Sequence, residues 1–119
     1  MATLTTHLLS SVDGQHAAGV AIAVVQRTTG SADIVLASGE SDRGGRFQAD
    51  ITPVNPTDAT RYECVLQTAR YFAEINPARD DVLEEIVIRF AMPDTTARYH
   101  MPLMIAPNNY SVWWSPPGG

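Results

Sequence analysis

The sequence predicts an all-β fold, an antiparallel β-sandwich of seven to eight short strands with one short helix. Short stretches alternate between apolar and polar side chains, as half-buried strands do. Turn residues separate these stretches at intervals of roughly 8–12 residues, which is the spacing typical of sandwiches. A length of 119 residues suits one hydrophobic core, so we expect residues 1–119 to form a single domain.

Alternation in the first half of the chain predicts three strands before a loop. In residues 4–9 the period of two places His7 on the same face as Thr5 and Leu9. A loop at 39–46 is rich in glycine and long enough to carry function. After it we expect only a brief edge element, because prolines interrupt the apolar stretch. The predicted strands of this half are 4–9, 20–27 and 34–37, with the edge element at 51–54.

The second half contains the one predicted helix, at residues 69–75. Asn76 and Pro77 end it, because the residue before a proline disfavours helical geometry. His100 is predicted on a strand, on the face opposite to its apolar neighbours. The predicted strands of this half are 62–68, 85–92, 99–105 and 110–114, and the terminal residues 115–119 cannot continue the last of them.

Composition limits the class of protein. Hydrophobic residues make up 45% and charged residues 18%, which is ordinary for a globular domain, and no apolar run is long enough to span a membrane. The N-terminus has no basic region before its few apolar residues, so we expect neither a secretory signal nor a transit peptide and a cytoplasmic location. Cys64, the single cysteine, lies in an alternating stretch and is predicted to be a core residue rather than a nucleophile.

The charge of the chain argues against nucleic acid as a partner. The formal net charge is −5, and the basic residues are all arginines scattered along the sequence. Phosphate binding depends on clustered basic residues, which release counterions from the nucleic acid. We therefore expect a small-molecule ligand and self-association, with no nucleic-acid or membrane partner.

Three histidines and one arginine are the candidates for chemistry. His16 follows a polar turn, and we interpret it as a solvated loop residue. His7 and His100 lie on predicted strands, where each is either a half-buried structural residue or a catalytic one. Arg46 follows two glycines and is either a loop cation or a ligand for an anion. Spacing alone does not decide between these alternatives.

Motifs for metals, nucleotides and serine nucleophiles are absent from the sequence. There is no CxxC pair, HExxH, phosphate-binding loop, GxGxxG or GxSxG pattern. We therefore expect no metal and no cofactor.

Several segments together resemble the 5-hydroxyisourate hydrolase family, which has the transthyretin-like fold. They occur in the order of that family, at approximately its distances, and span nearly the whole chain. The YHxPL pattern around His100 is the most specific of them. The matching segments are Leu4-Thr5-Thr6-His7-Leu8-Leu9, Gly45-Arg46, Tyr71-Phe72-Ala73, Val87-Ile88-Arg89-Phe90, and the run from Arg98 to Pro107.

The resemblance implies a homotetramer with active sites in a channel between its dimers. The residues that match the catalytic set of the family are His7, Arg46 and His100. Such a site opens a cyclic ureide by attack of water on a carbonyl, which needs a base and positive charge beside the oxyanion. We assign water activation to His7, hydrogen bonding of the substrate to His100, and fork-like contacts with its oxygens to Arg46. These three are expected to converge, while His16 stays outside.

The C-terminal segment departs from the family, which ends in Tyr-Arg-Gly-Ser. Here the matching residues are Trp113, Trp114 and Ser115, followed by Pro116. We predict these first three as substrate-binding residues of a less polar pocket, with Trp114 in the place of the family's arginine. Trp113 and Trp114 are adjacent on the predicted strand, so only one of them faces the channel. The alternative is that both pack at the subunit interface.

Three functions are compatible with the sequence. The first is hydrolysis of 5-hydroxyisourate. The second is hydrolysis of an N-substituted or otherwise different cyclic amide or ureide. The third is small-molecule binding without catalysis, which the retention of both strand histidines and the loop arginine disfavours.

Overall fold

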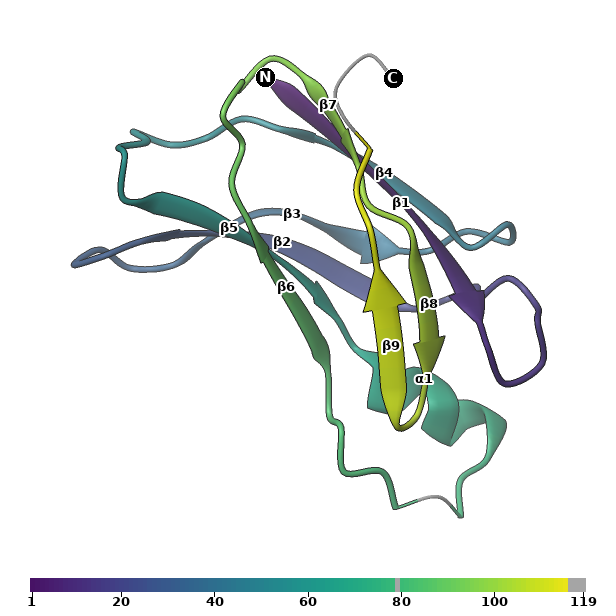
Figure 1. Ribbon diagram of the computed structural model, residues 1–119. Helices are drawn as coiled ribbons and strands as arrows, with labels where there is room; N and C mark the ends of the chain where they lie inside the picture. Colours follow the sequence, from purple (N-terminus) through teal and green to yellow (C-terminus); the bar gives the residue numbers. More distant parts are fainter. Residues whose placement is uncertain (79, 116–119) are drawn as a thin grey trace.

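Two sheets pack face to face in the computed structural model, which describes residues 1–78 and 80–115 (Figure 1). Within these residues there are nine strands and one helix. The elements are β1 (Ala2–Ser10), β2 (Ala21–Thr28), β3 (Ile34–Glu40), β4 (Arg46–Ile51), β5 (Thr60–Leu66), α1 (Thr68–Ile75), β6 (Ile86–Phe90), β7 (Arg98–His100), β8 (Leu103–Ala106) and β9 (Asn109–Val112).

The predicted fold class is confirmed, with two sheets and one short helix. One sheet has the order β4-β1-β8-β9, with β7 also paired to β1, and the other has the order β3-β2-β5-β6. Strand β1 runs parallel to β7 and β8, whereas the other pairings of the named strands are antiparallel. The helix α1 lies at the end of the sandwich away from the N-terminus (Figure 1).

The core lies between the sheets and follows the predicted alternation. Along β1 buried residues alternate with half-buried ones, so Leu4 and Leu8 face the core and His7 faces outward. Cys64 is 1% exposed, as predicted for a core residue. Burial raises the pKa of its thiol to about 12, so it carries no thiolate at neutral pH.

Two strand predictions were wrong. The edge element expected at 51–54 is instead β4, which begins at Arg46 and has Phe47 and Ile51 on its buried face. The glycines before Arg46 form a tight turn, so the strand starts sooner than a long loop would allow. The single strand expected at 99–105 is split into β7 and β8, because Pro102 between them has no N–H to donate to a neighbouring strand.

The turn before β4 depends on Gly45. Its φ of 74° is in the left-handed region that glycine tolerates. A Cβ at this position would lie 2.3 Å from the backbone oxygen of Leu8, so a side chain would separate the two segments. The carboxylate Oδ1 of Asp42 accepts the backbone N–H groups of Gly44 and Arg46, each at 2.9 Å. The turn thus fixes the first residue of β4 against β1.

Helix α1 matches its prediction within one residue. Its Phe72 is buried against the core, and the backbone N–H of Asn76 donates to the carbonyl of Phe72 at 2.9 Å where the helix ends. In the described residues, no helix is both long and apolar enough to cross a membrane.

Candidate active site

Strand β1 is the scaffold of the candidate site, with β4 on one side and β7 on the other. His7 lies directly opposite Arg46 across the β1–β4 pair, and Thr5 lies opposite His100 across the β1–β7 pair. Side chains of directly opposite residues share a sheet face. The register therefore brings His7, Arg46 and His100 to neighbouring positions on the outward face of this sheet.

The ring of His100 is oriented by Thr5. Its Nδ1 lies 2.7 Å from the Thr5 hydroxyl, which in turn donates to the backbone carbonyl of Tyr99 at 3.5 Å. The Thr5 hydroxyl can donate to or accept from this nitrogen, according to the tautomer of the ring. Nε2 of His100 is the nitrogen on the other side of the ring from this contact. Thr5, on the neighbouring strand, thus orients the ring of His100 on the outward face of the sheet.

His16 lies against His7, so the prediction that it stays outside the site was wrong. His16 Nδ1 is 2.9 Å from His7 Nε2, and the ring centroids are 5.0 Å apart with an interplanar angle of 27°. The turn after β1 folds the chain back, with Leu9 bridged to His16. A hairpin centred on the Asp13 region pairs positions 9 and 16, a register that the polar turn does not by itself specify.

The surroundings of His7 favour its neutral form. Burial lowers the pKa of the imidazole, and the positive charge of Arg46 and then that of His16 lower it further. A hydrogen bond with the backbone of Gly44 raises the pKa of His7, and the charge of His100 lowers it by the smallest amount. A histidine with a lowered pKa is unprotonated at neutral pH and can accept a proton.

The guanidinium of Arg46 is exposed at the start of β4. Within the described part of the chain, no carboxylate forms an ion pair with it. Its fork of N–H donors is therefore available to an oxygen-rich ligand on the face of His7.

Comparison with known proteins identifies the family. The sequence model of the HIUase/Transthyretin family matches residues 4–114. The chain belongs to this family. A 5-hydroxyisourate hydrolase of Deinococcus radiodurans is 32% identical over 111 residues, which cover 92% of each chain.

Solved structures of the same fold include an enzyme and a transthyretin. The 5-hydroxyisourate hydrolase of Klebsiella pneumoniae superposes with a TM-score of 0.69 at 29% identity, covering 97% of this chain and 99% of the other. Transthyretin from Sparus aurata gives a TM-score of 0.75 at 24% identity, covering 94% and 95%. The second likeness supports the fold alone.

The segment that departs from the HIUase/Transthyretin pattern lies beside His100. Strand β9 ends at Val112, so the prediction that both tryptophans lie on a strand was wrong. Beyond it the N–H of Trp113 donates to Pro102 at 3.3 Å, and that of Ser115 donates to His100 at 3.2 Å. Pro102 has no N–H to return, which weakens the ladder here. Residues 116–119 fall outside the described part, and with them the rest of the prediction for 115–119.

The register places the three tail residues predicted to bind substrate near the site. Ser115 is bridged to His100, and the pairing of β8 with β9 continues to set Trp113 opposite Pro102. Trp113 and Trp114 both lie beyond the end of β9. The two indoles are 50% and 67% exposed, respectively.

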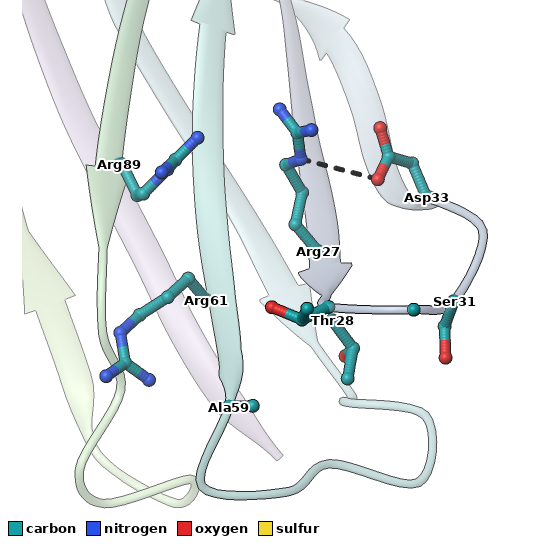
Figure 2. A pocket seen from close by; sticks show the side chains of 9 residues that line it. Arg27, Thr28, Ser31, Asp33, Ala59, Arg61 and Arg89 are labelled. Carbon is teal, nitrogen blue, oxygen red and sulfur yellow. Dashed lines mark ion pairs between the residues drawn. The ribbon is translucent and has the colours of Figure 1, made fainter.

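A second cleft, on the other sheet, has a different character (Figure 2). Two of its three lining arginines are ion-paired: Arg27 pairs with Asp33 at 3.4 Å and with Glu63 at 3.3 Å, and Arg89 pairs with Glu63 at 3.0 Å. Figure 2 shows the Arg61 guanidinium directed away from the other two. No histidine is among the described residues that line the cleft. It has the features of a structural ion network and not of a reaction centre.

Metal ligation has no support in the described residues. In 1–78 and 80–115, no group of three or more His, Cys, Asp or Glu side chains is placed to hold a metal ion. The distance of 2.9 Å between the nitrogens of His7 and His16 is that of a hydrogen bond.

Proposed function

We propose that this protein hydrolyses 5-hydroxyisourate. The observation that carries the proposal is the gathering of His7, Arg46 and His100 on one outward sheet face from three different strands. Relatives that match along nearly the whole chain bear the name of this enzyme. A protein that only binds its ligand has no evident need for a neutral imidazole beside a free guanidinium.

The proposed reaction follows from the chemistry of these groups. His7 takes a proton from water, and the oxygen forms a bond to a ring carbonyl carbon. Arg46 donates to the oxyanion that develops there, and His100 hydrogen-bonds the substrate. When the ring C–N bond breaks, its electron pair and the proton held by the base go to the nitrogen. The products are a carboxylate and an opened ureide.

We propose a homotetramer as the working form, with a channel between dimers over the outward face of β1. The support is that this face is open in the single chain and that members of this family are typically tetramers. Among the described residues, each sheet ends in strands with a single partner, β3 and β6 in one and β4 and β9 in the other, which leaves edges for a second subunit. A cytoplasmic location stays a prediction from the N-terminal sequence.

The second candidate function is hydrolysis of a less polar cyclic substrate, such as an N-alkylated ureide. The observation that favours it is the pair of exposed indoles at Trp113 and Trp114, next to the segment that carries His100. Indoles favour flat, weakly charged ligands by stacking and apolar burial.

The test is the decay of freshly generated 5-hydroxyisourate, followed by its ultraviolet absorbance with the spontaneous rate subtracted. We expect decay well above the spontaneous background. Arg46→Gln should lower kcat/KM by about 10²-fold, the usual cost of one donor to an oxyanion. Arg70→Gln is the matched control, because this arginine lies on α1 away from β1, and its rate should be unchanged. A wild-type rate equal to the spontaneous one would refute the proposal.

A further inference from the structure

We propose that His16 is a positioning residue for His7, and that the two imidazoles work as one proton-sharing pair. The use of this pair in catalysis rests on the proposed hydrolase function. The existence of the pair rests on geometry alone: Nδ1 of one ring lies 2.9 Å from Nε2 of the other, and the rings are stacked.

Backbone contacts hold His16 in place independently of its side chain. The N–H of Ala17 donates to the carbonyl of Leu8 at 2.9 Å, and the N–H of Ser10 donates to that of Gln15 at 2.8 Å. Gly45 packs against the same hairpin, and a Cβ there would lie 3.4 Å from that of His16. The hairpin after β1 therefore delivers this ring to His7 as part of the fold, and a substitution at His16 leaves these contacts available.

A bond between two imidazole nitrogens requires one proton. If both rings are neutral, one nitrogen donates and the other accepts. If both rings were protonated, two N–H groups would point at each other, and the positive charges would repel. Protonation of both rings at once is therefore disfavoured.

The charged groups around the pair also disfavour its protonation. Arg46 faces His7 from β4 and His100 faces it from β7, and both oppose its protonation. Within the described residues, no carboxylate forms an ion pair with His7 or His16 to offset them. The pair thus stays ready to accept a proton from water.

The pairing also occupies nitrogens of both rings. Nε2 of His7 and Nδ1 of His16 are joined, and the ring of His7 has a further hydrogen bond with the backbone of Gly44. A proton taken up by either ring moves along the shared bond, so the charge spreads over both rings. His100 shows the same principle, since Thr5 engages its Nδ1 and leaves Nε2. Each strand histidine of the face therefore has one nitrogen fixed by a neighbour.

The pair can be tested without activity, by ¹⁵N NMR of the histidine rings during a pH titration. In the wild type we expect His7 to titrate below the ordinary histidine range. In His16→Asn its titration should move to higher pH, because one of the charges that lower its pKa is gone. Gln15→Asn, in the same turn, should leave the His7 titration unchanged. Identical His7 titrations in the wild type and His16→Asn would overturn the proposal.

The catalytic use of the pair is tested by kcat/KM for 5-hydroxyisourate against pH. We expect His16→Ala to lose roughly 10-fold or more, with the acid limb of the profile moved to higher pH and KM little changed. His16→Asn should recover part of the rate, because its amide takes the place of Nδ1 and can hydrogen-bond His7 without titrating. An unchanged rate and profile in His16→Ala would overturn the positioning role even if the rings are coupled.

The two parts of this experiment separate the inference from the proposed function. If the wild type does not act on 5-hydroxyisourate, the hydrolase proposal and the catalytic role of the pair fail together. The NMR titration still decides whether the pair exists.

Discussion

Both outward sheet faces of this protein carry arginines, but their partners differ. On the β2-β5-β6 face, Glu63 is 7% exposed and receives hydrogen bonds from Arg27 and Arg89. On the β4-β1-β7 face, Arg46 lies opposite His7, and no carboxylate among the described residues pairs with it. On the first face Arg27 and Arg89 are ion-paired, whereas on the second the positive charge of Arg46 lies beside a proton acceptor.

The pKa directions express the same contrast. Burial alone would raise the pKa of Glu63, but hydrogen bonds from Arg89 and Arg27 outweigh it and lower that pKa. For His7, burial and neighbouring cations act together to lower the pKa. The Glu63 network stabilises its charges within the fold, while the His7 face favours an anionic transition state supplied by a ligand.

The largest effect we expect is on the His7 face. His7→Asn should lower kcat/KM for 5-hydroxyisourate by roughly 10²–10⁴-fold, the usual cost of losing an acid–base group. The melting temperature should change little, because this side chain faces outward from the sandwich. Paired rate and melting measurements check this. Full activity, or equal losses of rate and of stability, would contradict the assigned role.

The matched substitution on the other face should have the opposite profile. Glu63→Gln should lower the free energy of unfolding by about 1–3 kcal/mol, since it leaves two arginines without their carboxylate. The lower part of this range allows for the exposure of both arginine side chains, 46% and 61%. The rate per folded molecule should stay at the wild-type value. Urea unfolding and the absorbance assay, applied to the same samples, measure both quantities.

The pH dependence sharpens this second prediction. The folded pKa of Glu63 lies below the ordinary value of 4.5, so its stabilisation is fully present above that pH. It is lost as the pH falls through the lowered pKa. Wild type and Glu63→Gln should therefore differ in stability at neutral pH and converge in acid. A constant difference across this range would show that the carboxylate charge is not the stabilising feature.

The sequence predicted those parts of the fold and site that depend on local alternation. The period of two along residues 4–9 placed His7 on the face of Thr5 and Leu9, which is the outward face in the structure, and the alternating stretch around Cys64 placed the thiol in the core. Both follow from neighbours in the chain. A strand of this kind has only two faces, so the prediction needs no knowledge of its partners.

The errors concern features that depend on distant segments. His16 reaches His7 only because the hairpin pairs positions 9 and 16, and a polar turn does not by itself fix that register. The glycines before Arg46 suggested a long loop and not the start of a strand. The turn is tight because Gly45 packs directly against the backbone of β1, a contact that the local sequence does not reveal. The break between β7 and β8 could have been predicted from Pro102, which has no backbone N–H to donate. The apolar alternation continues on both sides of this proline and therefore favoured a single strand.

The smallest expected effect concerns the indoles that border the His7 face. The register sets Ser115 opposite His100. If the tail continues the alternation of a strand, Trp113 lies on the side of His100 and Trp114 on the other. If an indole contacts the substrate, an N-methylated analogue of 5-hydroxyisourate should be preferred by up to about 10-fold, the value of one methyl group in an apolar site. Trp113→Arg should remove this preference, because a guanidinium replaces apolar area with charge, whereas Trp114→Arg should retain it.

The ratio of kcat/KM for the two compounds is the measurement. A clear wild-type preference for the unsubstituted compound would show that the tail does not select an apolar substrate. Loss of the preference only in Trp114→Arg would instead show that the tail turns over after β9, with the second indole facing the substrate.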